Sequence, residues 1–185
     1  MSATTELGRT AQIPYTTRIG IDEGDRRQLV ALLNQTLADA FDLFSQTKQA
    51  HWNVKGQAFY PLHLLYDELA EKLEEPADLI AERVVLLGGY AFGTVRMAAQ
   101  SSRIDPFPSA GEAGAPSYLN ALADRWAQFS QNVRADHAMS EEIGDPGTTD
   151  LYDQLTHIAD RGLWFIEGHL QRYSGGLENG GADPQ

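Results

Sequence analysis

Residues 59–87 read FYPLHLLYDELAEKLEEPADLIAERVVLL, and their apolar side chains recur every three or four positions. Such spacing is typical of an amphipathic helix that buries one stripe. Pro76 lies inside this segment, where a proline costs about 3 kcal/mol and usually kinks a helix. Because the stripe keeps its phase across Pro76, we predict one kinked helix that ends at Gly88-Gly89. The stripe consists of Leu62, Leu65, Leu69, Leu73, Ile80, Val84 and Leu87.

A second helix is predicted on the N-terminal side of this segment, over residues 22–53. Its apolar stripe ends in a histidine, His51, and Gly56 then breaks the helix. The residues on this stripe are Leu33, Leu37, Phe41, Phe44, Lys48 and His51.

Two further helices are predicted in the C-terminal half. The first begins near Pro116, because proline is favoured in a first helical turn, and ends at residues 144–147, Gly-Asp-Pro-Gly. The second begins with Thr148 or Thr149 as its cap and runs to about Tyr173.

A long connection at residues 90–115 joins the two halves, and we expect a short helix in it around Thr94 to Gln100. A connection of this length can join two parallel neighbouring helices. The predicted fold is therefore all-α, a ferritin-like four-helix bundle with one long crossover that carries a short helix. We expect the bundle over residues 21–173, an N-terminal tail or arm over 1–20, and a flexible acidic tail over 174–185.

Charge and composition restrict the function. The chain has 26 acidic and 14 basic residues, a net charge of −12, and no cysteine. A polyanionic partner would be repelled, and thiolate chemistry is excluded. No apolar run approaches the roughly 18 residues of a membrane span and no export signal is visible, so we expect a cytoplasmic protein without a membrane partner.

One face of the helix at 59–87 carries His63, Asp67, Asp78 and Glu82. At about 100° per residue from Leu62, these four fall between about 100° and 200°. The plainest interpretation is a solvated polar face, since Glu71, Glu74 and Glu75 also lie on it. However, histidine beside carboxylates is a ligand set that suits Fe(II) or zinc better than calcium or magnesium.

The spacing on this face indicates a site shared between two chains. Asp67 and Asp78 are 11 residues apart, or about 16 Å along a helix, so they cannot bind one metal within one subunit. If two copies pack antiparallel about Lys72 or Leu73, His63 and Asp67 of one meet Asp78 and Glu82 of the other, and a two-fold axis creates two sites. A di-iron centre inside each subunit would need Glu-x-x-His pairs, and the sequence has none.

The order of these motifs resembles the Dps family of starvation-induced mini-ferritins over residues 25–173. The resemblance rests on specific runs of sequence. They are His51-Trp52-Asn53-Val54-Lys55-Gly56, Phe59, Leu62-His63, Asp67-Glu68, Asp78-Leu79-Ile80-Ala81-Glu82-Arg83, Gly88-Gly89, Gly93-Thr94 and Leu163-Trp164.

This resemblance implies a hollow dodecamer of four-helix subunits with iron sites at the two-fold interfaces. One subunit would supply His51, His63 and Asp67, and its neighbour Asp78 and Glu82. The family oxidises Fe(II), preferentially with hydrogen peroxide, and stores Fe(III) mineral, which protects the cell from oxidative damage. We expect iron as the metal, with zinc as a competing ion.

Other features leave alternatives open. A DNA-binding, nucleoid-compacting role is the second candidate function, and the net charge and the absence of lysine from both tails argue against it. Asp145, Asp150 and Asp153 either cap and charge the start of the last helix or, as the resemblance suggests, line a three-fold pore for iron. Trp52 and Trp164 either supply electrons at the iron site or, as we expect, are buried in the core.

Overall fold

The computed structural model describes residues 11–108 and 115–171. Most of the expected arm, at 1–10, and the whole expected acidic tail, at 174–185, lie outside the described residues, as does Tyr173. The described residues contain helices and no strand, so the all-α prediction is confirmed. The helices are α2 (Glu23–Asn53), α3 (Phe59–Leu86), α4 (Val95–Ser101), α5 (Ala115–Ile143) and α6 (Pro146–Leu170).

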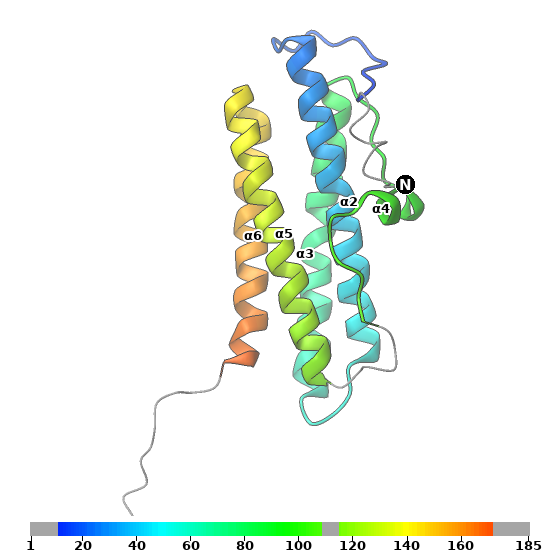
Figure 1. Cartoon of the computed structure of the whole chain (residues 1–185), viewed down its shortest axis with the longest axis vertical. Coiled ribbons are helices and arrows are strands. Elements are labelled where there is room, and N and C mark those ends of the chain that lie inside the picture. The colour runs from blue at the N-terminus through cyan, green and yellow to red at the C-terminus, as the bar shows by residue number, and fades with distance from the viewer. Residues whose placement is uncertain (1–10, 109–114, 172–185) are drawn as a thin grey trace, which may run out of the picture.

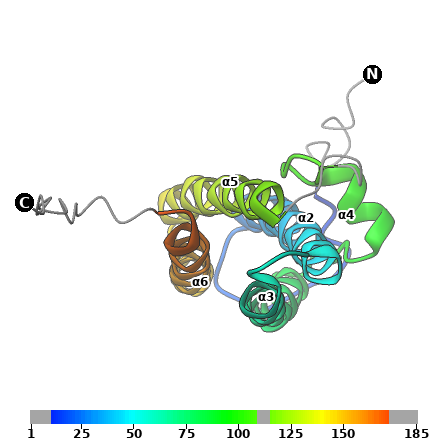
Figure 2. The same ribbon diagram turned by 90° about the horizontal axis from the view of Figure 1, so that it is seen from below.

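The four long helices form a bundle with one long crossover (Figure 1). The helices α2 and α3 make one antiparallel pair, and α5 and α6 make the other. Seen from below, α3 and α5 lie diagonally across the bundle, with α2 and α6 between them (Figure 2). The crossover therefore joins two helices of the same direction, as expected, but they are not neighbours.

Apolar burial explains this arrangement. Helix α2 buries Leu33 and Leu37 on the expected stripe, but it also buries Leu32 and Leu43 away from that stripe. It does so because α2 contacts three elements, α3, α4 and α5. A single stripe in the sequence thus underestimates how central this helix is.

Helix α3 is continuous through Pro76, as the phase of its stripe predicted. The expected core residues of α3 are buried, except Leu65, which is half-buried. The helix ends where Gly88 adopts a φ of +86°, and the Tyr15 N–H donates to the Gly88 carbonyl. A Cβ at Gly88 would lie 2.5 Å from the Tyr15 carbonyl oxygen, so only glycine fits this turn.

The start of α6 differs from the prediction. Its N-cap is Asp145, whose side chain accepts a hydrogen bond from the Thr148 backbone N–H at 3.2 Å, and Pro146 occupies the first turn. The expected cap at Thr148 or Thr149 is therefore wrong. The helix begins earlier because proline lacks an N–H and has a φ that suits a first turn.

A buried polar cluster fastens the crossover to the bundle. Arg103 donates to both carboxylate oxygens of Asp136, at 3.0 and 2.6 Å, and to Asp39 at 2.8 Å. Thr36 donates to Asp136 at 2.8 Å and also bonds the Tyr152 hydroxyl. We call these five residues the closed cluster, because each charged group in it has a partner of opposite charge.

Polar side chains of α2 hold the crossover at further points. The amide of Asn34 donates to the Tyr90 carbonyl and accepts from the Phe92 N–H, while Gln46 donates to the Asp105 carbonyl. These contacts fix the connection along α2. In the parts of the chain that the structure describes, no helix has the length and apolar character needed to cross a membrane.

Candidate metal site

The end of α2 and the start of α3 bring two histidines together. Gly56, with a φ of +105°, turns the chain after Asn53, so that α3 returns alongside α2. The rings of His51 and His63 stack with centroids 3.8 Å apart and planes 18° apart. Residues that are twelve positions apart in the sequence thus form one imidazole pair.

Both imidazoles are oriented by the backbone. His51 Nδ1 lies 2.7 Å from the His63 carbonyl oxygen, and His63 Nδ1 lies 2.9 Å from the His51 carbonyl oxygen. A carbonyl only accepts, so each Nδ1 carries the proton and each neutral ring keeps its lone pair on Nε2. Such backbone contacts orient metal-binding histidines in proteins. The pair therefore presents two Nε2 atoms as ligands.

Asp67 lies beside this pair and is held by a lysine. Its Oδ1 is 3.8 Å from His51 Nε2 and 2.5 Å from Lys48 Nζ. The hydrogen bond from Lys48 lowers the pKa of Asp67, and desolvation opposes this effect only in part. The carboxylate is therefore kept ionised next to the two imidazoles, which is the state that binds a metal.

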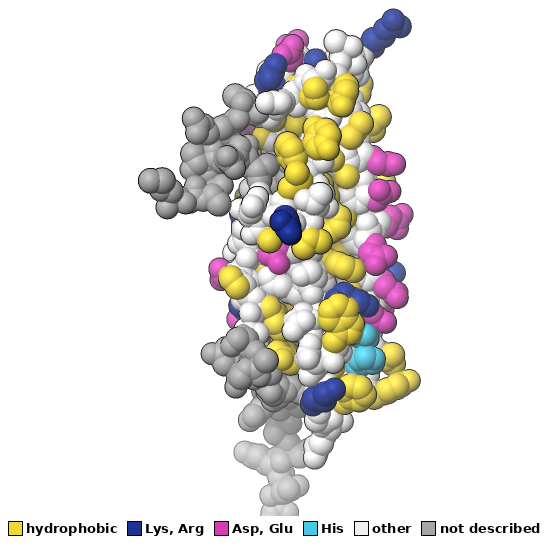
Figure 3. All heavy atoms as spheres, turned by 90° about the vertical axis from the view of Figure 1, so that its right-hand side faces the viewer, with side chains coloured by type: hydrophobic (Ala, Val, Ile, Leu, Met, Phe, Trp, Pro, Cys, Tyr) yellow, Lys and Arg dark blue, Asp and Glu magenta, His cyan; other side chains and the backbone are white. Residues whose placement is uncertain are grey.

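Asp78 and Glu82 lie further along α3 and are both exposed. Asp78 borders a hollow of about 440 Å³ that is lined largely by apolar side chains, among them Phe41 and Phe44 of α2. Glu82 borders another, of about 500 Å³, with Val85 and Leu86. Figure 3 shows hydrophobic side chains and a column of acidic ones together on the side of the molecule that faces right in Figure 1.

A single chain brings together three of the five expected ligands. His51 Nε2 lies 3.8 Å from Asp67 Oδ1 and the His63 ring stacks on that of His51, whereas Asp78 and Glu82 are about three and about four turns of α3 beyond Asp67. Within the ranges 11–108 and 115–171, no group of three or more His, Asp or Glu side chains is already arranged to hold a metal ion. The donors fit iron in kind, with two imidazoles and one ionised carboxylate, and more carboxylates are needed to complete a site.

The tryptophans contradict the expectation of burial. Trp52 and Trp164 are 61% and 65% exposed, and the buried tryptophan is Trp126. Trp52 follows His51 by one residue, or about 100° around α2, so it points away from the face that His51 buries.

The acidic residues at the start of α6 divide into two kinds. Asp145 is buried and bonded to Arg83 and Thr148, so the capping interpretation is confirmed for it. Asp150 and Asp153 are exposed, and Asp153 bonds His137 of α5 at 2.9 Å.

Sequence reasoning missed two parts of the site. The sequence placed Lys48 on the same stripe as His51, but its ion pair with Asp67 was not predicted. The available signal was the spacing of three residues between Lys48 and His51, which puts both side chains on one face of the helix. The carbonyl oxygens that orient the histidines carry no signal in the sequence, because every residue has one.

Comparison with known proteins places this geometry in context. A Ferritin-like domain matches residues 30–175. The DNA protection during starvation protein of Agrobacterium fabrum is 34% identical over 160 residues, which cover 86% of this chain and 98% of the relative.

Among solved structures, DpsC from Streptomyces coelicolor superposes with a TM-score of 0.81 at 32% identity and covers 89% of this chain and 97% of its own. DpsA14 from Streptomyces coelicolor superposes with a TM-score of 0.82 at 31% identity, with the same coverage of both chains.

Proposed function

The chain belongs to the Dps family of ferritin-like proteins, and from that membership we propose that it is a ferroxidase and iron-storage mini-ferritin. Fe(II) is its substrate, and hydrogen peroxide is its preferred oxidant. The observation that carries the proposal is the imidazole pair of His51 and His63, which presents two Nε2 atoms beside the ionised Asp67.

A second copy of the chain completes the site. Asp78 and Glu82 are exposed beside hollows with apolar walls, and Leu79, Val85 and Leu86 are exposed on the same helix. An antiparallel copy of α3 would cover this apolar surface and bring its own Asp78 and Glu82 to the partner's histidines. Burial of apolar area drives this association, and each pair of chains holds two sites.

The residues have separable tasks in the reaction. The imidazoles and Asp67 bind Fe(II), and the neighbouring copy's carboxylates offset the charge of the oxidised product. One hydrogen peroxide takes one electron from each of two Fe(II) ions, its O–O bond breaks, and with two protons it leaves as two water molecules. Because this uses up both Fe(II) and peroxide, hydroxyl radicals are not formed from them.

The proposed size of the assembly rests on the resemblance to the Dps family, together with closed symmetry. We propose a dodecamer of about 245 kDa, twelve times the 20.4 kDa of one chain, that encloses the Fe(III) mineral. Such a shell would carry a net charge of about −144, twelve times the −12 of one chain. We therefore expect DNA to be protected by removal of iron and peroxide rather than by direct binding.

Anaerobic titration of the assembled protein with Fe(II) and peroxide tests the proposal. We expect one peroxide consumed for every two Fe(II) oxidised, and little oxidation by His63→Ala. His169→Ala is the matched control, because this histidine is exposed in the last turn of α6 and should not change the rate. Equal rates for all three proteins would refute the proposed site.

A further inference from the structure

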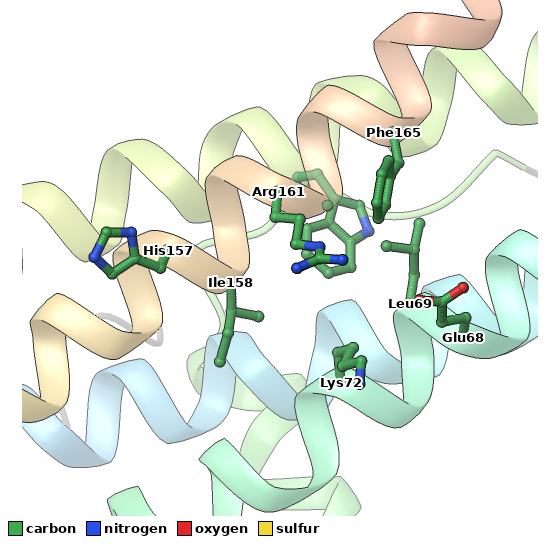
Figure 4. Close-up of a pocket in the computed structure, with 9 residues that line it drawn as sticks. Glu68, Leu69, Lys72, His157, Ile158, Arg161 and Phe165 are labelled. Atoms are coloured by element: carbon green, nitrogen blue, oxygen red, sulfur yellow. The ribbon is translucent and has the colours of Figure 1, made fainter.

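A cavity of about 320 Å³ lies between α3 and α6 (Figure 4). This volume falls within the range of small-molecule sites, which combine apolar walls with a few polar groups. Its lining residues are Glu68, Leu69 and Lys72 of α3, Trp126 of α5, and His157, Ile158, Arg161, Gly162 and Phe165 of α6.

The floor of this cavity is aromatic and fixed. Trp126 is buried, and its Nε1 donates to the Thr47 hydroxyl at 3.3 Å. A Cβ at Gly162 would lie 2.2 Å from the Trp126 ring, so glycine allows α6 to pass directly over the indole. Leu69, Ile158 and Phe165 extend the apolar wall. Trp126 is itself covered by this contact, so the apolar wall that a ligand can reach is formed by the half-buried Ile158 and Phe165.

Two permanent cations face this apolar floor. In Figure 4, Arg161 extends from α6 into the space between the helices, and Lys72 lies on the α3 side. Neither has a carboxylate within ion-pair distance among the residues described, although Arg83, Arg103 and Arg134 are paired. Two cations without a carboxylate partner thus lie at one cavity, and the Arg161 guanidinium lies over the Phe165 ring, 5.3 Å from its centroid.

The cavity lies on a different face of α3 from the proposed metal ligands. At about 100° per residue from Leu62, Glu68, Lys72 and Leu69 fall at about 240°, 280° and 340°, whereas the metal-binding face centres near 150°. The lining residues of the cavity are therefore separate from the proposed metal ligands.

We infer that this cavity binds a small organic anion. The apolar or aromatic body of the ligand lies against Ile158 and Phe165, and its phosphate or carboxylate group lies between Lys72 and Arg161. Glu68 is the one carboxylate in the lining and opposes such a ligand by like charge. Removing either positive charge should therefore lower the affinity for the anion, and removing the negative charge of Glu68 should raise it.

Calorimetric titration of the assembled, iron-free protein with phenyl phosphate tests the inference. Lys72→Gln and Arg161→Gln should each weaken binding about ten-fold, and Glu68→Gln should strengthen it by several-fold. Arg96→Gln is the matched control, because it removes one positive charge from an exposed position on α4 outside the cavity. It should leave the affinity unchanged.

Two further ligands separate the parts of the inference. Phenol lacks the anionic group and inorganic phosphate lacks the ring, so both should bind at least ten-fold more weakly than phenyl phosphate. Equal affinity of phosphate and phenyl phosphate, or the same affinity in all four variants, would overturn the inference. If Lys72→Gln or Arg161→Gln fails to fold, the affinity of Glu68→Gln for phenyl phosphate is the deciding measurement. Removal of this negative charge raises the affinity only if the anion binds beside it. None of these measurements depends on iron oxidation.

Discussion

Helix α2 contributes side chains to two groups of polar residues, the closed cluster and the open group of expected metal ligands. The two groups differ in whether their polar atoms already have partners within the chain. In the closed cluster, Asp39 and Asp136 are 0% and 2% exposed, and Arg103 contacts both. In the open group, the imidazole pair keeps two Nε2 atoms free, and Asp78 and Glu82 are exposed on α3. The chain completes the first group by itself, whereas in the proposed function a metal and a partner complete the second. Unsatisfied ligands, rather than charge density, therefore distinguish a site from a structural cluster.

The electrostatics of the closed cluster agree with a structural role. Burial raises the pKa of Asp39, and Arg103 offsets only part of this effect. Burial alone would lower the pKa of Arg103, but its hydrogen bond with Asp136 and the charge of Asp39 raise it above the ordinary value. The guanidinium of Arg103 thus stays charged at any ordinary pH.

The largest expected effect is on the closed cluster. Asp136→Ala leaves Arg103 and Thr36 without their shared partner in a buried place, so the free energy of unfolding should fall by about 3–5 kcal/mol. Urea unfolding at fixed protein concentration measures this change. The control is Asp124→Ala on the same helix, an exposed residue, which should change it by less than about 0.5 kcal/mol. A similar small loss for Asp136→Ala would show that the cluster does not hold the crossover.

The next effect concerns the open group and tests whether it is shared. His63→Ala and Glu82→Ala should each lower the rate of Fe(II) oxidation about 100-fold, because loss of even an outer partner of a metal ligand costs 10–100-fold. Oligomers refolded from an equal mixture should regain about a quarter of the wild-type rate. A site is intact only when one chain supplies His63 and the other Glu82, which random pairing gives in about one case in four.

The control for this experiment is a mixture of His63→Ala with Asp67→Ala. Both changes damage the same half of the site, so no pairing restores it and no activity should return. Equal recovery in the two mixtures, or none in verified mixed dimers, would rule out a site shared in this way.

The sequence predicted more of the fold than of the site. The stripes of α2 and α3 predicted their bounds to within a residue, because apolar periodicity is a local property of the chain. The diagonal placement of α3 and α5 depends on how helices pack together, which periodicity does not encode. For the same reason, histidines at the expected positions were predictable, but the carbonyl oxygens that orient them were not.

The smallest expected effect is at Asp145, a second closed contact. Burial would raise the pKa of Asp145, but hydrogen bonds from Thr148 and Arg83 outweigh it, and the pKa is lowered overall. A carboxyl with a lowered pKa in the folded state contributes stability that is present above its unfolded pKa, about 3.9. This stability is lost as the pH falls through the folded value.

Asp145→Asn keeps an oxygen to cap α6 but removes the charge that Arg83 contacts, so we expect a loss of about 1–2 kcal/mol at pH 7. The difference between variant and wild type should shrink below about pH 4, where wild-type Asp145 also becomes protonated. Urea unfolding midpoints from pH 7 to pH 3 at fixed protein concentration measure this trend. Asp150→Asn is the matched control: it lies exposed on the same helix and bonds only Gln154, so it should change stability by less than about 0.5 kcal/mol. If Asp145→Asn changes the free energy of unfolding as little as Asp150→Asn does at every pH, the ion pair with Arg83 does not contribute to stability. In that case, a buried charged residue with a partner of opposite charge is not necessarily a stabilising one.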